Sequence, residues 1–385
     1  MSWKFPHYEV NQPLNWPVLL ATYPWIADMA GVPQDPVWHA EGDVLTHTRL
    51  VVEALIAAPE FATLTEADKH IMVTAALLHD VEKRSTTTTE VIDGAERIVA
   101  PRHAKKGEFT ARRLLYTDLP TPFATRERIC KLVRLHGLPL WAIERPDPVR
   151  TVVRASLSVD TRLLAMLARA DVRGRHCDDA DDLLLRIDLF EELCREHACF
   201  GQPRAFASDQ ARYHYLNRPD AYLEYVPYDQ PTCTVHMLAG LPGSGKDTYL
   251  QRHLANLPVV SIDDLRRANG VAPTDKKGNG RMVQLAKEAA RVELRAGRDF
   301  VFNATNLTTM MRRRWTGLFT EYGAAVRLVY LEVPYRELLR RNRARMHPVP
   351  VGVLERMIGG LEVPGVEEAW SVEFFVGAGS QVPGS

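Results

Sequence analysis

The stretch TVHMLAGLPGSGKDT, residues 234–248, decides the fold of the second half of the chain. It joins a short apolar segment, a glycine-rich turn that ends in Lys246, and the start of a helical pattern. In parallel α/β domains this order forms a phosphate-binding loop, because glycines let backbone N–H groups surround a phosphate and the helix N-terminus attracts negative charge. We therefore expect Gly240, Gly243, Gly245 and Lys246 to bind phosphate groups.

Apolar segments that alternate with helical patterns continue beyond this loop. Three of them end at a polar turn, and these are residues 258–262, 299–304 and 324–333. Alternation of this kind is typical of strands that are joined by helices and lie parallel in one sheet. The sequence therefore predicts an α/β domain with a parallel sheet over residues 232–385.

The first half has a different pattern, because its apolar residues recur at helical spacing. Val44, Val51 and Leu55 are an example. This spacing predicts an all-α domain over residues 1–220. A segment with three prolines and little periodicity, residues 217–232, is the expected linker.

Composition narrows the class of protein. A chain of 385 residues is long enough for two domains, and its 48 basic and 48 acidic residues argue against a protein that coats long nucleic acids. Five cysteines at irregular spacing indicate a reducing compartment. The longest uncharged run is interrupted by prolines, and the first ten residues lack a signal-peptide core. We expect a cytoplasmic protein that does not bind membranes.

Acids and arginines after the loop indicate phosphoryl transfer. Asp263 follows the second predicted strand, where it could take the proton of an attacking hydroxyl or could merely cap a helix. Asp247 stands where Ser or Thr normally serves Mg²⁺, and its carboxylate could bind that ion. A later arginine-rich helix is expected to close over the transferred phosphate through Arg341 and Arg345, unless it is only a solvated basic face. Residues 312–314 are expected at the surface.

Four predicted helices in the first half each place a metal-type ligand on an apolar face. These ligands are His47, the adjacent His79 and Asp80, His136, and Asp171. Burial of an unpartnered imidazole or carboxylate costs roughly a few kcal/mol. A shared metal therefore accounts for these residues better than four separate coincidences do.

The segments GLPGSGKDT, SIDDLR and NATN resemble the phage and bacterial polynucleotide 5′-kinase family. This resemblance implies that Asp263 is the general base for a 5′-hydroxyl and that Arg266 holds the phosphate of the acceptor. It assigns Lys246 and Thr248 to the nucleoside triphosphate. With the rest of the loop and the two lid arginines, the residues expected to bind the triphosphate are Gly240, Gly243, Ser244, Gly245, Lys246, Asp247, Thr248, Arg341 and Arg345. Asn303 departs from the aspartate that is common in such kinases. We expect Asp247 to replace that missing acid.

The segments EGDVLTHT, LLHDVEK and ARADVRG resemble the HD-domain phosphohydrolases. The resemblance implies two neighbouring metal sites, which would be formed by His47, His79, Asp80 and Asp171 and by Asp80, His103 and His136. His103 could instead contact phosphate. Lys83 would contact the substrate phosphate unless it is an ordinary exposed lysine, and His39 is expected to line the pocket. Imidazole-rich sites suit Mn²⁺, Co²⁺ or Ni²⁺ better than Mg²⁺.

Both halves together resemble a bacterial fusion of an HD-domain phosphohydrolase with a polynucleotide 5′-kinase, which is an RNA end-healing enzyme. This resemblance implies that ATP or another nucleoside triphosphate, with Mg²⁺, phosphorylates 5′-hydroxyl ends. It also implies removal of 2′-phosphate, 2′,3′-cyclic phosphate or 3′-phosphate from RNA or DNA ends, which an RNA ligase could then join. Two alternatives stay open: a nucleotide kinase and phosphohydrolase of small molecules, and a non-catalytic regulatory protein that senses ATP.

Overall fold

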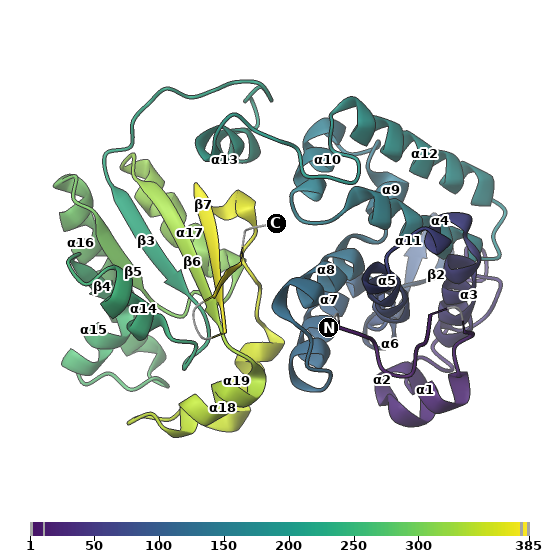
Figure 1. Ribbon diagram of the computed structural model, residues 1–385, viewed down its shortest axis with the longest axis horizontal. Coiled ribbons are helices and arrows are strands. Elements are labelled where there is room, and N and C mark those ends of the chain that lie inside the picture. Colours follow the sequence, from purple (N-terminus) through teal and green to yellow (C-terminus); the bar gives the residue numbers. More distant parts are fainter. Residues whose placement is uncertain (1–2, 11, 378–379, 383–385) are drawn as a thin grey trace. The chain divides into compact units, whose positions relative to one another are not determined.

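The computed structural model describes residues 3–10, 12–377 and 380–382. The chain divides into two compact units, Met1–Ala205 (unit 1) and Phe206–Ser385 (unit 2) (Figure 1). Helix α13 (Asp209–Asn217) belongs to unit 2, where Arg212 donates a hydrogen bond to the carbonyl of Trp370. The predicted domain bounds, 1–220 and 232–385, stay a prediction. Within the described ranges, every helix is too short or too polar to cross a bilayer.

Unit 1 is a bundle of helices around one apolar core. Its helices are α1 (Trp16–Thr22), α2 (Pro24–Ala27), α3 (Val44–Ala57), α4 (Pro59–Ala62), α5 (Glu66–Leu78), α6 (Lys83–Thr86), α7 (His103–Thr117), α8 (Phe123–Leu135), α9 (Leu138–Trp141), α10 (Pro148–Ser156), α11 (Thr161–Arg173) and α12 (Ala180–Glu196). Helix α5 is buried from His70 to its last residue and packs against α3, α8 and α11. These four helices therefore bring five of the predicted metal ligands together, and the sixth, His103, begins α7.

One hairpin interrupts the helices of unit 1. Strands β1 (Thr88–Ile92) and β2 (Ala95–Val99) pair in antiparallel fashion. The turn consists of Asp93 and Gly94, which both have positive φ, as a tight hairpin turn requires. The helical prediction overlooked this Asp-Gly signal.

Unit 2 has a six-stranded sheet in the order β4-β5-β3-β6-β7-β8. Its strands are β3 (Thr234–Ala239), β4 (Val259–Ser261), β5 (Phe300–Asn303), β6 (Ala325–Glu332), β7 (Ser371–Val376) and β8 (Ser380–Val382). All neighbours are parallel except β7 and β8. The predicted parallel α/β fold is confirmed, and the four predicted strand segments each contain a strand. The sheet continues into β7 and β8, which the sequence prediction missed.

The helices of unit 2 connect these strands. Besides α13 they are α14 (Lys246–His253), α15 (Ile262–Ala268), α16 (Lys276–Arg295), α17 (Thr309–Glu321), α18 (Tyr335–Arg343), α19 (Val351–Gly359) and the short η1 (Val366–Glu368). Helix α17 packs on the sheet through aromatic side chains, since Trp315 lies 4.2 Å from Phe302 between ring centroids. The phosphate-binding loop lies between β3 and α14, as the sequence predicted.

Arg312 is fully buried, so its predicted place at the surface was wrong. Its guanidinium donates to both carboxylate oxygens of Glu368, at 2.7 and 2.8 Å. It also donates to the carbonyls of Asn306 and Glu362. Arg312 precedes Trp315 by three residues, which places both on the inner face of α17, and the ion pair with Glu368 compensates for the buried charge.

Candidate active sites

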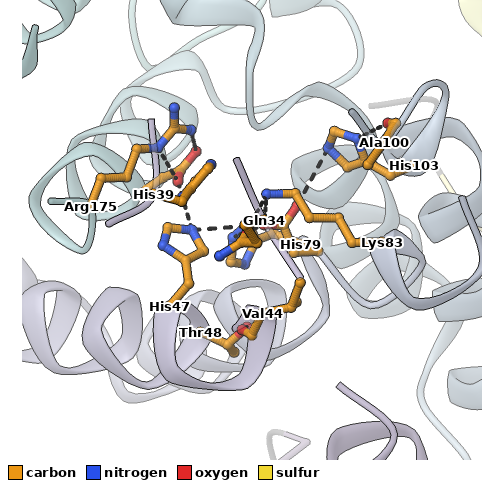
Figure 2. Close-up of polar contacts among 12 residues, drawn as sticks. Gln34, His39, Val44, His47, Thr48, His79, Lys83, Ala100, His103 and Arg175 are labelled. Carbon is orange, nitrogen blue, oxygen red and sulfur yellow. Dashed lines mark hydrogen bonds and ion pairs between the residues drawn. The ribbon is translucent and has the colours of Figure 1, made fainter. Parts of the chain in front are cut away.

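Four histidines of unit 1 turn their Nε2 atoms toward the carboxylate of Asp80. In three of them, Nδ1 is hydrogen-bonded to the backbone carbonyl three residues earlier: His79 at 2.7 Å, His103 at 2.7 Å and His136 at 2.8 Å. Figure 2 shows this bond for His103, whose partner is Ala100. In His47, Nδ1 lies 2.8 Å from a carboxylate oxygen of Glu41. With Nδ1 turned to these oxygens, each ring presents Nε2 to the acidic centre, as a metal ligand would.

Asp80 lies between two pairs of these rings. Its Oδ2 is 3.3 Å from Nε2 of His79 and 3.7 Å from Nε2 of His47. Its Oδ1 is 3.4 Å from Nε2 of His103 and 3.9 Å from Nε2 of His136. The result is two triads of candidate ligands that share Asp80. This arrangement suits two adjacent metal ions with a bridging carboxylate.

Three buried atoms of this cluster have no hydrogen-bond partner among the described residues. They are Nδ1 of His47, which meets Glu41 only as an ion-pair contact, Nε2 of His79 and Oδ1 of Asp80. A buried polar atom without a partner is costly, and ligation of a cation removes that cost. The side chains therefore fit the divalent metal that the sequence predicts.

Asp171 completes the cluster from helix α11. Its Oδ1 lies 3.1 Å from Nε2 of His47, and its carboxylate also accepts two hydrogen bonds from Arg175, at 3.1 and 2.6 Å. Burial alone would raise the pKa of Asp171, but Arg175 and His47 hold it well below its usual range. The group is therefore an anion that can bind a cation.

Lys83 is largely buried and points at the same centre. Its Nζ lies 2.8 Å from Oδ2 of Asp80 and donates to the side-chain oxygen of Gln34 at 2.7 Å (Figure 2). Burial tends to raise the pKa of Asp80, but Lys83 and His79 keep it well below its usual range. The position of Lys83 fits a contact with a substrate phosphate and does not fit an ordinary exposed lysine.

Glu41 is a site residue that the sequence analysis did not assign. Its fully buried Oε1 lies 2.8 Å from Nδ1 of both His39 and His47, and its Oε2 accepts from the backbone N–H of His176 at 2.9 Å. Burial lowers the pKa of His39 to about 4 despite this carboxylate. Glu41 thus orients His47. The sequence held a signal for this role, because Glu41 lies between His39 and His47 within nine residues.

In unit 2, the backbone of the phosphate-binding loop needs its glycines. Gly240 and Gly245 have positive φ, and a Cβ atom at Gly240 would overlap the carbonyl oxygen of Leu331. Lys246 begins helix α14, and its Nζ donates to the carbonyls of Gly240 and Leu241. Burial lowers the pKa of Lys246 to about 8, although Asp247 and Asp263 act in the opposite direction.

The two positions where this loop departs from the kinase pattern contact each other. Oδ1 of Asp247 accepts a hydrogen bond from Nδ2 of Asn303 at 3.0 Å. Asn303 is the last residue of β5, the strand beside the loop. The carboxylate of Asp247 therefore lies close to the place where the carboxylate of an aspartate at position 303 would be.

Asp263 is in the first turn of α15, but it is not the cap of that helix. Ser261 is the cap, because its side chain accepts the N–H of Asp264. The carboxylate of Asp263 lies 3.0 Å from Nη2 of Arg266 and close enough to Lys246 to affect its pKa. The acid, the arginine and the loop lysine thus lie near one another, and the roles that the kinase resemblance implies for them stay predictions.

The two arginines predicted to close over the phosphate, Arg341 and Arg345, line the pocket over the loop, as Arg252 also does. This pocket has a volume of about 520 Å³ and contains Gly243, Ser244, Gly245, Lys246, Asp247 and Thr248 together with Arg341 and Arg345. Helix α18 ends at Arg343, so the prediction that Arg345 lies on this helix was wrong. Arg341 is held by Glu337, whose Oε1 is 2.6 Å from its Nε. Both arginines nevertheless reach the same pocket.

Comparisons with known proteins agree with the two units. The family model described as HD domain matches residues 44–174, and the family model described as AAA domain matches residues 235–364. A solved structure of a candidate kinase from Chloroflexus aurantiacus is similar at 15% identity and a TM-score of 0.32, over 38% of this chain and 87% of that one. The chain thus contains an HD domain followed by a P-loop kinase-like domain.

Proposed function

We propose that this chain heals broken RNA ends, with a 5′-kinase in unit 2 and a 2′,3′-phosphohydrolase in unit 1. The observation that carries the proposal is the presence of an HD domain and a P-loop kinase-like domain in one chain. One domain type removes phosphate and the other adds it. The two activities are compatible on one substrate when they act on opposite ends, and the product is an end pair that an RNA ligase can join.

In unit 1, His47, His79, Asp80 and Asp171 would hold one metal ion, and His103 and His136 would hold a second one with Asp80. An imidazole-rich site favours Mn²⁺, Co²⁺ or Ni²⁺, which supply Lewis acidity for hydrolysis of a phosphate ester. Glu41 keeps the ring of His47 oriented, since it lies 2.8 Å from Nδ1.

The unit 1 pocket also supplies positive charge for the substrate phosphate. Lys83 and Arg175 carry that charge, and they line one pocket of about 430 Å³ together with His39, His103 and the acids Asp35 and Asp179. The ammonium group of Lys83 neutralises charge on the phosphoryl oxygens as the ester bond breaks. His39 has a pKa of about 4 because it is buried, so it is neutral at pH 7 and orients the substrate by hydrogen bonding rather than by charge.

In unit 2, the carboxylate of Asp263 takes the proton of the 5′-hydroxyl. The hydroxyl oxygen bonds to the γ-phosphorus, the bond from phosphorus to the β–γ bridging oxygen breaks, and a nucleoside diphosphate leaves. The loop amides, Lys246 and Thr248 bind the triphosphate, and Arg266 binds the phosphate of the acceptor. Asp247 would hold Mg²⁺, and Arg341 and Arg345 neutralise the charge that develops.

Transfer of labelled phosphate to a 5′-hydroxyl RNA oligonucleotide tests the proposal, with a free nucleoside and a DNA oligonucleotide as competing acceptors. We expect the RNA oligonucleotide to be phosphorylated faster than the nucleoside. Preference for the nucleoside would favour a small-molecule kinase. Absence of transfer to every acceptor, with ATP still bound, would favour a regulatory protein.

A further inference from the structure

Two half-exposed tryptophans lie at the pocket of unit 1. Trp38 is 38% exposed and Trp141 is 44% exposed. Both line the same pocket of about 430 Å³ as Lys83 and His103. A ligand in the pocket would cover these aromatic side chains, and this would be favourable because it removes apolar surface from water.

Each indole is held in place by an arginine. The guanidinium carbon of Arg97 lies 5.3 Å from the ring centroid of Trp38, and that of Arg186 lies 5.0 Å from the ring centroid of Trp141. These are cation–π contacts. The two tryptophans come from separate segments, because Trp38 precedes α3 and Trp141 ends α9. The pocket is thus provided with two fixed aromatic surfaces.

The arginines are themselves anchored. Nη1 of Arg97 lies 3.4 Å from Oδ1 of Asp35, whose Oδ2 accepts the backbone N–H of Ile98 at 3.1 Å. Arg186 is paired with Glu144, and its Nε donates to Asp182 at 2.6 Å. Such anchoring limits the motion of both rings, so little conformational entropy is lost when a flat ligand stacks on them.

We propose that Trp38 and Trp141 bind the nucleobase of the nucleotide whose phosphate is removed. The inference rests on the proposed phosphohydrolase and adds a source of specificity to it. Aromatic faces bind bases by stacking regardless of base identity, and Lys83 in the same pocket receives the phosphate. The volume of about 430 Å³ lies in the range of small-molecule sites and suits one nucleotide better than a protein partner. The site therefore selects phosphate esters that carry a base.

The test compares 3′-AMP with glycerol 2-phosphate, which has a phosphate but no base. Binding to the full chain is measured by calorimetry without added metal, and phosphate release is measured with Mn²⁺. The variants are Trp38→Ala, Trp141→Ala and the corresponding Phe variants. Leu185→Ala is the matched control, because Leu185 is 55% exposed on α12 and is not a lining residue. The tryptophan variants also separate this site from any 3′-AMP bound by unit 2.

We expect each Ala variant to bind 3′-AMP roughly tenfold more weakly and to lose kcat/KM for it by a similar factor. The Phe variants retain most of the affinity, and glycerol 2-phosphate is unaffected. Equal loss for both ligands, or no loss for 3′-AMP, overturns the base site. Binding that depends on the tryptophans without any phosphate release supports the base site and contradicts the phosphohydrolase instead.

Discussion

The metal centre of unit 1 joins side chains from separate helices, whereas the phosphate-binding loop of unit 2 is mostly the backbone of one continuous segment. His47 and Asp171 are 124 residues apart in the chain, yet Nε2 of His47 lies 3.1 Å from Oδ1 of Asp171. Gly240 to Thr248, by contrast, are consecutive residues that form the turn after β3 and the first residues of α14. Single side-chain changes should therefore inactivate each site for different reasons, and each should leave the other unit active.

The largest effect is expected for Asp80→Ala, because Asp80 belongs to both triads of the metal centre. Phosphate release from a 3′-phosphorylated oligonucleotide should fall on the order of a thousandfold, while 5′ phosphorylation is retained. Phosphate release and bound metal are measured together. The control is Asp181→Ala, an exposed acid of α12. Undiminished phosphate release from Asp80→Ala would refute the role of the bridging carboxylate.

The next effect concerns the stability of unit 2. Arg312→Met leaves Glu368 as a buried charge without its ion pair. The free energy of unfolding of unit 2 should fall by about 3 kcal/mol. Urea denaturation measures this change, with the loss of kinase activity as the signal that unit 2 has unfolded. Arg313→Met, at an exposed neighbouring position, should have little effect. Equal stability of the two variants would contradict the importance of the buried pair.

Lys246→Ala tests the loop of unit 2 in the same way that Asp80→Ala tests the metal centre. The loop amides remain, but the ammonium group is lost, so transfer to a 5′-hydroxyl end should slow about a hundredfold. Labelled phosphate incorporation is the measurement, with the exposed Lys277→Ala as control. Kinase activity near the wild-type rate would show that Lys246 has a different role.

Glu41→Gln keeps the shape of the side chain but removes the charge that lies beside two imidazoles. Metal affinity of unit 1 should fall by about 10- to 100-fold, as is typical when a group that orients a ligand is lost. Competition with a chelating dye measures the affinity, and Glu53→Gln on the exposed face of α3 is the control. Unaltered affinity would mean that His47 needs no orienting carboxylate.

The smallest effect is expected for Asp247→Ala. The Mg²⁺ concentration needed for half-maximal kinase rate should rise by roughly severalfold, because a carboxylate near the triphosphate is lost. In the double variant Asp247→Ala with Asn303→Asp, the Mg²⁺ concentration for half-maximal rate should return part of the way to the wild-type value, since the two side chains are in contact. A requirement that does not change in either variant would exclude Asp247 as a metal-binding group.

The two regions also differ in how much could be predicted from the sequence. The loop was predictable because strand, glycines and lysine are consecutive. The sequence singled out His47, His79, Asp80, His136 and Asp171 because each lies on or directly after an apolar helical pattern, whereas His103 came from the family resemblance. Glu41 was missed because its role depends on two rings that it meets only in the folded chain. Arg312 was misplaced because its partner Glu368 is 56 residues away.

Short elements were the other source of error. The hairpin of unit 1 has an Asp-Gly turn, but β1 is exposed, β2 is at most half-buried, and both lack the apolar alternation that marks a strand. Strand β7 joins the sheet beside β6, and β8 pairs with β7. Their pairing depends on tertiary contacts, which local patterns do not reveal.

The central claim is that one chain carries two independent sites for opposite ends of an RNA. It is tested most directly with one oligonucleotide that has a 5′-hydroxyl and a 2′,3′-cyclic phosphate, incubated with ATP, Mg²⁺ and Mn²⁺. Wild-type protein should convert both ends, Asp80→Ala only the 5′ end, and Lys246→Ala only the 3′ end. Loss of both reactions in either stably folded variant, or conversion of neither end by the wild-type protein, would contradict the claim.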